Sequence, residues 1–268
     1  MKTILITRFA IELDSSFMFF ESKEGIDWFN QRLSLFKKTC LPSIINQELL
    51  PNLWLIFIMK NDYISSELSN VIKGIDFIKI VEIEQYKPFN EIVTEHLLEM
   101  NHSKSITTRL DCDDALCPEY FKVLQAVSSD KSFDCLFEPT KGLSLRIENN
   151  TITRAAYIKK LLPPFLSFIN ISGQSRHVFS FNHDEWPDNF NKETLDIIPL
   201  WIQISHKKNI SNQFGWGWMV KSVLEVNPRK IQKFLPNLDV VKISRFNILK
   251  SNLSNLVKHF TKGSNLQL

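Results

Sequence analysis

The run from Trp54 to Met59 consists entirely of apolar residues. A run of this kind is typical of a strand in a parallel sheet that helices cover on both faces. On either side of it, short β-favouring runs alternate with segments of helical periodicity. Strands are predicted over 2–7, 54–59, 78–83 and 104–110, and helices over 28–39, 44–50, 65–73 and 88–100. The alternation predicts an α/β fold with a mostly parallel sheet, right-handed crossovers and flanking helices.

The second half of the chain shows a different pattern, in which short strands are joined by polar loops. A helix is predicted over 118–128. Strands are predicted over 133–138, 142–148, 151–157, 168–172, 178–181 and 200–205, with a hairpin-type turn at 148–151. An irregular connection is expected over 12–23, and there is no internal repeat.

The bulk composition excludes two classes of protein. A chain of 268 residues is long enough for one large domain, or for one domain with an appendage. The hydrophobic fraction of 44% and the 21 phenylalanines predict a packed core and exclude a disordered chain. The net charge of +3 is too small for a dedicated nucleic-acid binder.

Cysteine usage and the amino terminus indicate a cytoplasmic protein. The cysteines, Cys40, Cys112, Cys117 and Cys135, show no zinc-type spacing with histidines, so four reduced thiols are expected. The apolar run near the amino terminus is interrupted by Arg8. It is too short for a signal peptide or a membrane span, and it fits a buried first strand better.

Three carboxylates follow the predicted strand 104–110, namely Asp111, Asp113 and Asp114. Burying unpaired charge at a strand end costs free energy, and a bound divalent cation such as Mn²⁺ or Mg²⁺ offsets that cost. The carboxyl edge of an open α/β sheet is also where a nucleotide is expected. The alternative is an acidic surface turn in which Asp114 caps the next helix.

Asp111-Cys112-Asp113-Asp114 resembles the Asp-x-Asp motif of GT-A glycosyltransferases, and Thr108 to Ala115 resembles a rhamnosyltransferase family of bacterial surface-polysaccharide clusters. Further similar stretches are Thr7-Arg8-Phe9, the segment Trp28 to Gln47 with Pro42-Ser43, Leu200 to His206, and Asn209 to Asn212. Four landmarks in order are much more specific than one acidic motif. The resemblance implies a GT-A (Rossmann-like) domain over 1–239, with a nucleotide-binding half at 1–117 and an acceptor half at 118–239.

The resemblance also implies roles for individual residues. Asp113 would coordinate the metal, and Asp111 would bind the ribose or join the metal shell, with Asp114 behind them. His206 would contact the metal or the diphosphate, with Asn209 in the adjoining loop. The base or the phosphates would be contacted by Thr7, Arg8 and Arg109, although Arg109 alternatively forms a salt bridge to a nearby aspartate.

A general base is needed to take the proton from the acceptor hydroxyl if the enzyme inverts configuration. Asp184 and Glu185 are the candidates, and a solvated loop is the alternative for both. His183 fits the family better than either acid. The aromatic side chains of Trp186, Trp216 and Trp218 are candidates for stacking on sugar rings, or for core packing.

The segment 240–268 contains no Asp or Glu, and its basic residues are accompanied by apolar residues at helical spacing. A basic amphipathic helix is therefore predicted. Such a helix lies either on an anionic membrane surface or against the catalytic domain.

Together with the acidic motif, the resemblance implies a metal-dependent glycosyltransferase for a UDP- or dTDP-linked sugar. Rhamnose, galactofuranose, galactose and other hexoses fit equally well as the donor sugar. The acceptor would be a glycan or lipid-linked intermediate of O-antigen or capsule synthesis at the cytoplasmic membrane face, with inversion expected. The alternatives are a non-catalytic glycan-binding scaffold, and a metal-dependent nucleotidyltransferase or phosphohydrolase, which predicts a glycine-rich loop that Thr7-Arg8-Phe9-Ala10 lacks.

Overall fold

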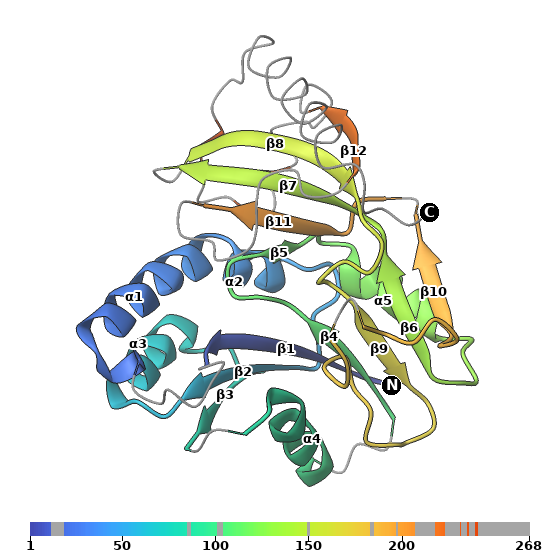
Figure 1. Ribbon diagram of the computed structural model, residues 1–268, viewed down its shortest axis with the longest axis horizontal. Coiled ribbons are helices and arrows are strands. Elements are labelled where there is room, and N and C mark those ends of the chain that lie inside the picture. Colours follow the sequence, from blue (N-terminus) through green and yellow to red (C-terminus); the bar gives the residue numbers. More distant parts are fainter. Residues whose placement is uncertain are drawn as a thin grey trace.

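The structure is a computed structural model. It describes residues 1–11, 19–84, 87–100, 104–148, 151–182, 185–196, 198–206, 218–222, 231, 235 and 239–240. Its strands form two sheets, and helices lie on both sides of the larger one (Figure 1). Almost all of the predicted helical segment 240–268 lies outside the described residues.

The larger sheet has the strand order β10-β6-β9-β4-β1-β2-β3. Its parallel half consists of β1 (Lys2–Ala10), β2 (Leu53–Met59), β3 (Ile78–Ile83) and β4 (Ser105–Arg109). On the other side of β4 are the antiparallel strand β9 (Ser167–Asn170) and then β6 (Cys135–Pro139) and β10 (Lys192–Leu195). Because β9 is antiparallel to both β4 and β6, strands β6 and β10 run in the same direction as β1 to β4, and only β9 is reversed among the described strands of this sheet. The predicted mostly parallel α/β sheet is confirmed, and β1 to β4 end at one common edge.

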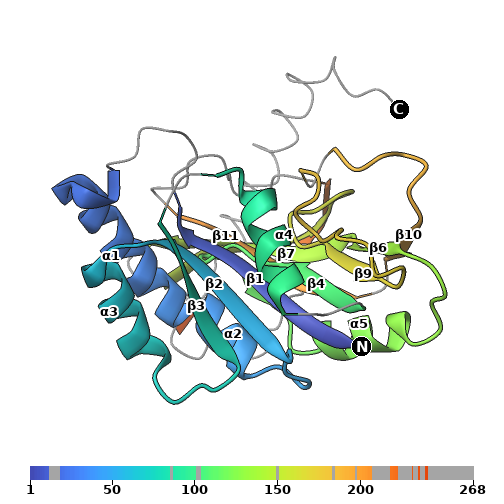
Figure 2. The same cartoon turned by 90° about the horizontal axis from the view of Figure 1, so that it is seen from below.

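Helices connect the parallel strands as predicted, but the helix predicted over 44–50 instead covers 40–45, with Asn46 as its C-cap. The helices are α1 (Lys23–Lys38), α2 (Cys40–Ile45), α3 (Asp62–Ile72), α4 (Phe89–Glu99) and α5 (Tyr120–Ser128), and a short 3₁₀ helix, η1 (Phe19–Glu21), precedes α1. Figures 1 and 2 show α4 on one side of the larger sheet, and α2 on the other side, next to β5. Covering both faces explains why the apolar run in β2 is continuous.

Helix α1 begins at Lys23, five residues before the first apolar residue used to predict it. The Ser22 hydroxyl caps this end by accepting a hydrogen bond from the Gly25 N–H at 3.0 Å. Asn61 caps α3 in the same way, through the N–H groups of Tyr63 and Ile64. The predicted start was late because the first turn of α1 is polar and gives no hydrophobic periodicity.

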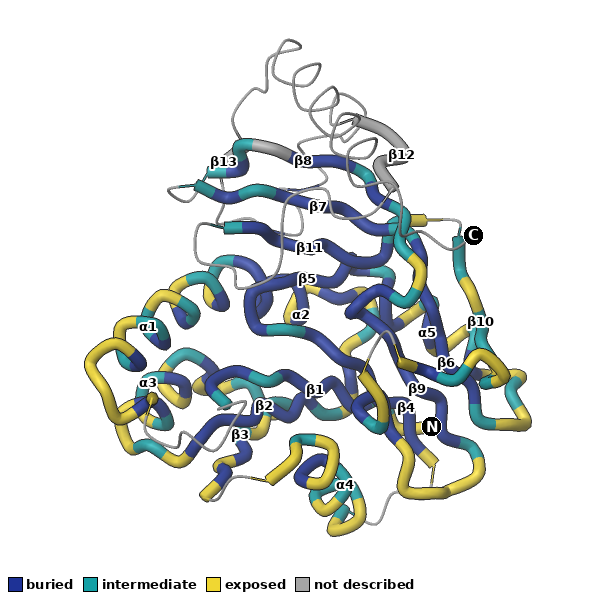
Figure 3. The backbone as a smooth tube through the Cα atoms, viewed as in Figure 1, coloured by how far each residue is buried: buried dark blue, intermediate teal, exposed yellow. Residues whose placement is uncertain are grey.

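The smaller sheet has the order β12-β8-β7-β11-β5. Its members are β5 (Ala115–Leu116), β7 (Lys141–Glu148), β8 (Thr151–Lys159), β11 (Trp201–Ser205) and β12 (Trp218–Ser222), and β13 (Asp239–Val240) also pairs with β8. The antiparallel pairing of β7 with β8 confirms the predicted hairpin. Figure 3 shows that β11 and β5, next to the larger sheet, are buried.

Gly142 allows β7 to pair with the bulky strand β11. A Cβ atom at Gly142 would lie 2.1 Å from the ring of Trp201, which is its register partner. The Trp201 ring stacks on Phe165 with a centroid separation of 4.7 Å, and its indole N–H donates to the Pro139 carbonyl at 2.6 Å. These contacts fix β11 against both sheets.

Two differences from the predicted elements have a clear cause. The predicted strand 178–181 is wrong, because the segment is a turn in which the Ser180 N–H donates to the His177 carbonyl at 2.9 Å. Its apolar residues are explained by side-chain packing, since Phe179 packs edge-on against Phe89. The strands β5 and β10 were not predicted. Strand β5 has only two residues, and β10 is mainly polar, so neither shows the residue pattern that is typical of a strand.

Candidate functional site

The acidic motif lies directly after β4, at the carboxyl edge of the parallel strands. Leu110 N–H donates to the Ile6 carbonyl at 3.1 Å, which extends the pairing of β4 with β1 by one residue. The chain then turns, with the Asp114 N–H donating to the Asp111 carbonyl at 3.2 Å, and enters β5. The predicted position of the acids at the end of a buried strand is confirmed.

Helix α2 and the residues after it hold β5 in place. The Gln47 side-chain amide donates to the carbonyls of Ser43 and Cys117 at 2.8 and 2.9 Å. The Ser43 hydroxyl accepts a hydrogen bond from the Leu116 N–H at 3.3 Å. The stretch with Pro42-Ser43 and Gln47 therefore has a structural role, because it holds the strand that follows the acidic motif.

Asp114 connects the motif to β11. Its side chain is fully buried, and Oδ1 accepts a hydrogen bond from the Ile204 N–H at 2.7 Å. Burial, and then the charges of Asp113 and Asp111, raise the pKa of this carboxyl well above its ordinary value. The alternative role of Asp114 as a helix cap is wrong, because α5 begins at Tyr120.

Asp113 is contacted by two cationic or ionisable side chains from distant segments. Arg32, on α1, forms a hydrogen-bonded ion pair with Oδ2, and the His206 Nε2 atom lies 3.2 Å from the same oxygen. Burial alone would lower the pKa of the Arg32 guanidinium, but the charge and hydrogen bond of Asp113, together with the other acidic groups of the motif, give a net rise of that pKa. The guanidinium also lies over the Trp28 ring, 5.1 Å from its centroid.

Asp111 lies between the two other arginines of the site. Arg8 Nη2 is 3.9 Å and Arg109 Nη2 is 3.6 Å from Asp111 Oδ1. Both guanidiniums face Phe179, at 5.6 and 5.3 Å from its ring centroid, and Arg8 also faces Phe89 at 5.7 Å. Burial, and then the charge of Arg109, lower the pKa of Arg8. The salt bridge considered for Arg109 is present.

His177 fixes the position of Phe179. Its Nδ1 atom accepts a hydrogen bond from the Phe179 N–H at 3.2 Å, and Nε2 lies 3.1 Å from the Asn90 carbonyl and 2.9 Å from the Thr94 hydroxyl on α4. Burial lowers the pKa of this imidazole from 6.5 to about 4. The neutral ring therefore connects α4 to the aromatic ring that contacts both arginines.

The structure places the other predicted site residues as follows. Thr7 is fully buried, and its hydroxyl accepts a hydrogen bond from the Trp54 indole N–H at 2.9 Å. Glu185 is exposed and accepts a hydrogen bond from the Asn182 side chain at 2.7 Å. Asp184 and Asn209 lie outside the described residues, as do His183 and Trp216. The roles assigned to these residues stay predictions.

Trp186 is a core residue rather than an exposed platform for a sugar. Its side chain is buried, and it stacks on Phe168 with a centroid separation of 5.5 Å. Phe181 and Phe190 also pack against it. The core alternative is therefore correct for this tryptophan.

The fit of a divalent cation depends on Asp113 and His206. Within the described residues, no group of three or more His, Cys, Asp or Glu side chains converges as a metal site. Asp113 Oδ2 and His206 Nε2 do converge, with 3.2 Å between them. Mg²⁺ is commonly held by one or two carboxylates together with substrate phosphates, so this pair fits an ion whose coordination is completed by substrate oxygens.

Residues 20–217 match the family described as "Putative rhamnosyl transferase". The chain belongs to this family. The match includes the acidic motif, α2 with the residues up to Gln47, and β11, which are the segments whose contacts form the site. It confirms the resemblance drawn from the sequence, and it places the chain in a glycosyltransferase family.

Solved structures resemble the chain more distantly. The crystal structure of S. aureus TarS 1–349 is 10% identical, with a TM-score of 0.43, and the alignment covers 76% of this chain and 60% of that one. TarS 1–349 in complex with UDP-GlcNAc is 10% identical with a TM-score of 0.47, and the alignment covers 98% of this chain and 73% of that one. HddC from Yersinia pseudotuberculosis is 14% identical with a TM-score of 0.38, and the alignment covers 77% of this chain and 90% of that one. The chain thus spans about three fifths of the first of these structures. No curated protein matches the sequence.

Sequence reasoning missed Arg32, Phe89, His177 and Phe179. Arg32 lies within a helical pattern that contains no sign of a partner 81 residues away. Phe89 lies in the predicted helix 88–100 and Phe179 in the predicted strand 178–181, and their apolar side chains alone do not indicate a contact with an arginine.

Proposed function

We propose that this chain transfers a sugar from a nucleoside-diphosphate donor to a hydroxyl of a glycan or lipid-linked acceptor. The proposal rests on the family match and on one observation about charge. Three guanidiniums, those of Arg8, Arg32 and Arg109, surround two carboxylates at the carboxyl edge of the sheet. Positive charge in excess of the acids suits a diphosphate, whose charge grows as the glycosidic bond to the sugar breaks.

Each side of the site has its own task in this mechanism. Arg8 and Arg109 bind phosphate oxygens through paired N–H groups, and Phe179 keeps their planes in position. Arg32 stabilises the charge on the leaving diphosphate, next to Asp113. Asp114 and Ile204 keep the motif rigid, so these donors need no reorganisation during the reaction.

A bound Mn²⁺ or Mg²⁺ ion is part of the proposal. Asp113 and His206 would hold it, and Asp111 is the further candidate ligand. When bound, the ion supplies Lewis-acid stabilisation of the diphosphate. Arg32 contacts the same Asp113 oxygen, so its guanidinium would share this carboxylate with a bound ion.

The finer parts of the proposal come from the family resemblance. The donor is a UDP- or dTDP-linked rhamnose, galactofuranose, galactose or related hexose. Inversion would use Glu185 or Asp184 as the general base. The setting is bacterial surface-polysaccharide synthesis in the cytoplasm, with 240–268 on the anionic inner face of the membrane. No helix in the described part of the chain is long and apolar enough to cross a membrane.

Thermal unfolding of the full chain with UDP, dTDP, GDP and CMP, each with Mn²⁺ or with EDTA, tests the proposal. A ligand at 100 times its dissociation constant stabilises the native state by about 2.7 kcal/mol, which is a readily measured shift in Tm. We expect a shift with UDP or dTDP that chelation reduces and Asp113→Asn abolishes. The matched control is Asp188→Asn, which removes an exposed carboxylate outside the site.

Product analysis distinguishes the alternatives. Release of nucleoside diphosphate from a sugar nucleotide supports glycosyl transfer. Formation of a sugar nucleotide from a sugar 1-phosphate and a nucleoside triphosphate indicates a nucleotidyltransferase, and saccharide binding without turnover indicates a scaffold. If no nucleotide changes Tm, the proposed donor site is wrong.

A further inference from the structure

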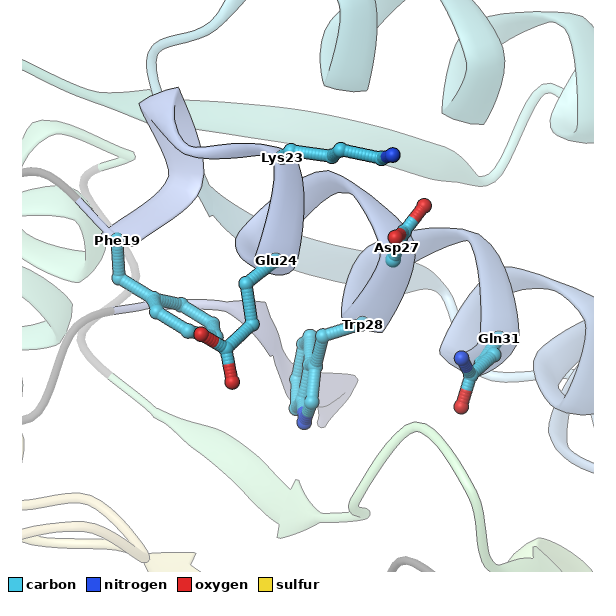
Figure 4. Close-up of a pocket in the computed structure, with 6 residues that line it drawn as sticks. All are labelled: Phe19, Lys23, Glu24, Asp27, Trp28 and Gln31. Atoms are coloured by element: carbon cyan, nitrogen blue, oxygen red, sulfur yellow. The ribbon is translucent and has the colours of Figure 1, made fainter.

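Helix α1 and the 3₁₀ helix η1 border an open hollow of about 610 Å³. It is lined by Phe19, Lys23, Glu24, Asp27, Trp28 and Gln31 (Figure 4). In Figure 4 the rings of Phe19 and Trp28 extend from the helix on the same side, and the Glu24 carboxylate reaches between them. The hollow adjoins the arginine-rich site, because the Trp28 ring that lines it lies under the Arg32 guanidinium.

The backbone holds the two rings in place. Gly25 allows η1 to lie directly on the first turn of α1, since a Cβ atom there would be 1.9 Å from the Phe19 carbonyl oxygen. That carbonyl accepts hydrogen bonds from the Ser22 N–H and hydroxyl at 3.0 and 2.6 Å. Phe19 then meets Trp28 edge to face, with centroids 6.4 Å apart, and the buried Phe20 supports Trp28 from behind at 5.7 Å.

The exposure of these rings needs an explanation. Phe19 is 38% exposed and Trp28 is half-buried, although the core offers both residue types a more favourable environment. Rigid aromatic rings beside carboxylates and an amide form a surface suited to a ligand with both apolar and hydroxyl groups. A sugar there would pack its C–H faces on the rings, while the Glu24 carboxylate and the Gln31 amide, which Figure 4 shows on the same side of α1, would bond to its hydroxyls.

The charge of the hollow disfavours a phosphate. Among the described residues that line it, Lys23 is the one cation, against the two carboxylates of Glu24 and Asp27. The donor site has the opposite balance, with three guanidiniums around two carboxylates. A nucleoside diphosphate is therefore favoured at the donor site, and an uncharged ligand is favoured here.

The hollow is linked to the donor site through one side chain. Trp28 lines the hollow, and its ring lies under the Arg32 guanidinium, which pairs with Asp113. A ligand on the Trp28 ring would therefore be next to Arg32, the residue that contacts the acidic motif. We infer that this hollow binds a neutral sugar residue of the acceptor glycan. The inference rests on the proposed glycosyl transfer.

Saturation-transfer-difference NMR on the full chain tests the inference directly, with methyl glycosides of rhamnose, galactose, glucose and N-acetylglucosamine as probes. Glucose 1-phosphate is the charged comparison. We expect at least one neutral glycoside to bind and glucose 1-phosphate to bind more weakly. Phe19→Ala combined with Gln31→Ala should raise the dissociation constant about tenfold, since it removes one ring contact and one hydrogen-bonding group. Glu99→Gln, on the exposed surface of α4, should leave it unchanged.

Two further measurements separate this inference from the donor site. The Tm of Phe19→Ala/Gln31→Ala without ligand shows whether the variant folds, and its Tm shift with UDP or dTDP should equal that of the wild type. Asp113→Asn should lose the nucleotide shift and keep the saccharide signal. The inference is overturned if no neutral glycoside binds, or if the double variant binds as well as the wild type. Loss of the nucleotide response alone would instead count against the donor site.

Discussion

Asp111 and Asp113 are two residues apart on one turn, yet their surroundings differ. The Asp113 side chain is 7% exposed and is bonded by Arg32, while the Asp111 side chain is 29% exposed and lies 3.6 to 3.9 Å from its two arginines. Charges attract more strongly where water is excluded, and an unpaired charge there costs more. The comparison indicates that the contacts of Asp113 with Arg32 are already formed before any ligand binds. The contacts of Asp111 with Arg8 and Arg109 are longer and more open to solvent.

Asp113→Asn should have the largest effect. It leaves the 11% exposed Arg32 side chain without its anion, which we expect to cost about 3 kcal/mol of unfolding free energy, as for other buried pairs. Sugar-nucleotide turnover should fall by at least about 10²-fold, because an electrostatic element of the site is lost. Urea unfolding and a donor-turnover assay measure the two effects.

A double-mutant cycle with Arg32→Met sharpens this comparison. If the ion pair is the cause, the two substitutions together should be less destabilising than the sum of the single ones. Additive losses of unfolding free energy, or an Asp113→Asn variant as stable as the wild type, would show that the pair of Asp113 with Arg32 does not stabilise the folded chain.

Asp111→Asn should change stability less. Its pairs with Arg8 and Arg109 are longer and more exposed, so we expect a loss of no more than about 1 kcal/mol in urea unfolding. Nucleotide affinity should still fall, because two cations then lack the carboxylate that orients them. A stability loss larger than that of Asp113→Asn would reverse the comparison.

Phe179→Leu tests the aromatic support on the Asp111 side. Without the ring, Arg8 and Arg109 lose a face that restricts their planes, at a cost of about 1 kcal/mol. We expect the KM for the donor to rise about fivefold while kcat changes little. Phe190→Leu, in the cluster around Trp186, is the matched control and should leave KM unchanged.

At neutral pH the smallest expected effect is that of His177, which appears only as the pH falls. Its folded pKa of about 4 lies below the ordinary 6.5, so between these values the unfolded chain binds more protons than the folded one. The free energy of unfolding should therefore decrease as pH falls from about 6.5 towards 4. His177→Gln should make urea unfolding less sensitive to pH across this range. An unchanged pH dependence would mean that another group is responsible.

Much of the fold could be predicted because its strands are buried and apolar. The predicted strand 78–83 has the bounds of β3, and 54–59 is one residue shorter than β2. Errors are concentrated where the signal is not hydrophobic: the polar first turn of α1, and the edge strand β10. Apolar content alone misled the prediction at 178–181, where the residues pack without pairing as a strand.

The acidic motif could be predicted from three carboxylates that follow a buried strand, and Arg8, Arg109 and His206 from the family resemblance. The structure brings Arg8 and Arg109 to Asp111 and His206 to Asp113. Arg32 could not be predicted, because helical periodicity identifies the buried face of α1 but not which residue meets position 113. His177 acts through Phe179 and α4, and such a role depends on contacts that no local pattern encodes.

The hydrogen bond from Ile204 to Asp114 spans 90 residues of chain. Domains are synthesised from the amino terminus, so the acids leave the ribosome long before the strand that fixes them. A nascent chain that stops before β11 carries the whole motif without the backbone donor that satisfies Asp114. Assembly of the site thus coincides with near-completion of the smaller sheet, and an unfinished polypeptide has no organised donor site.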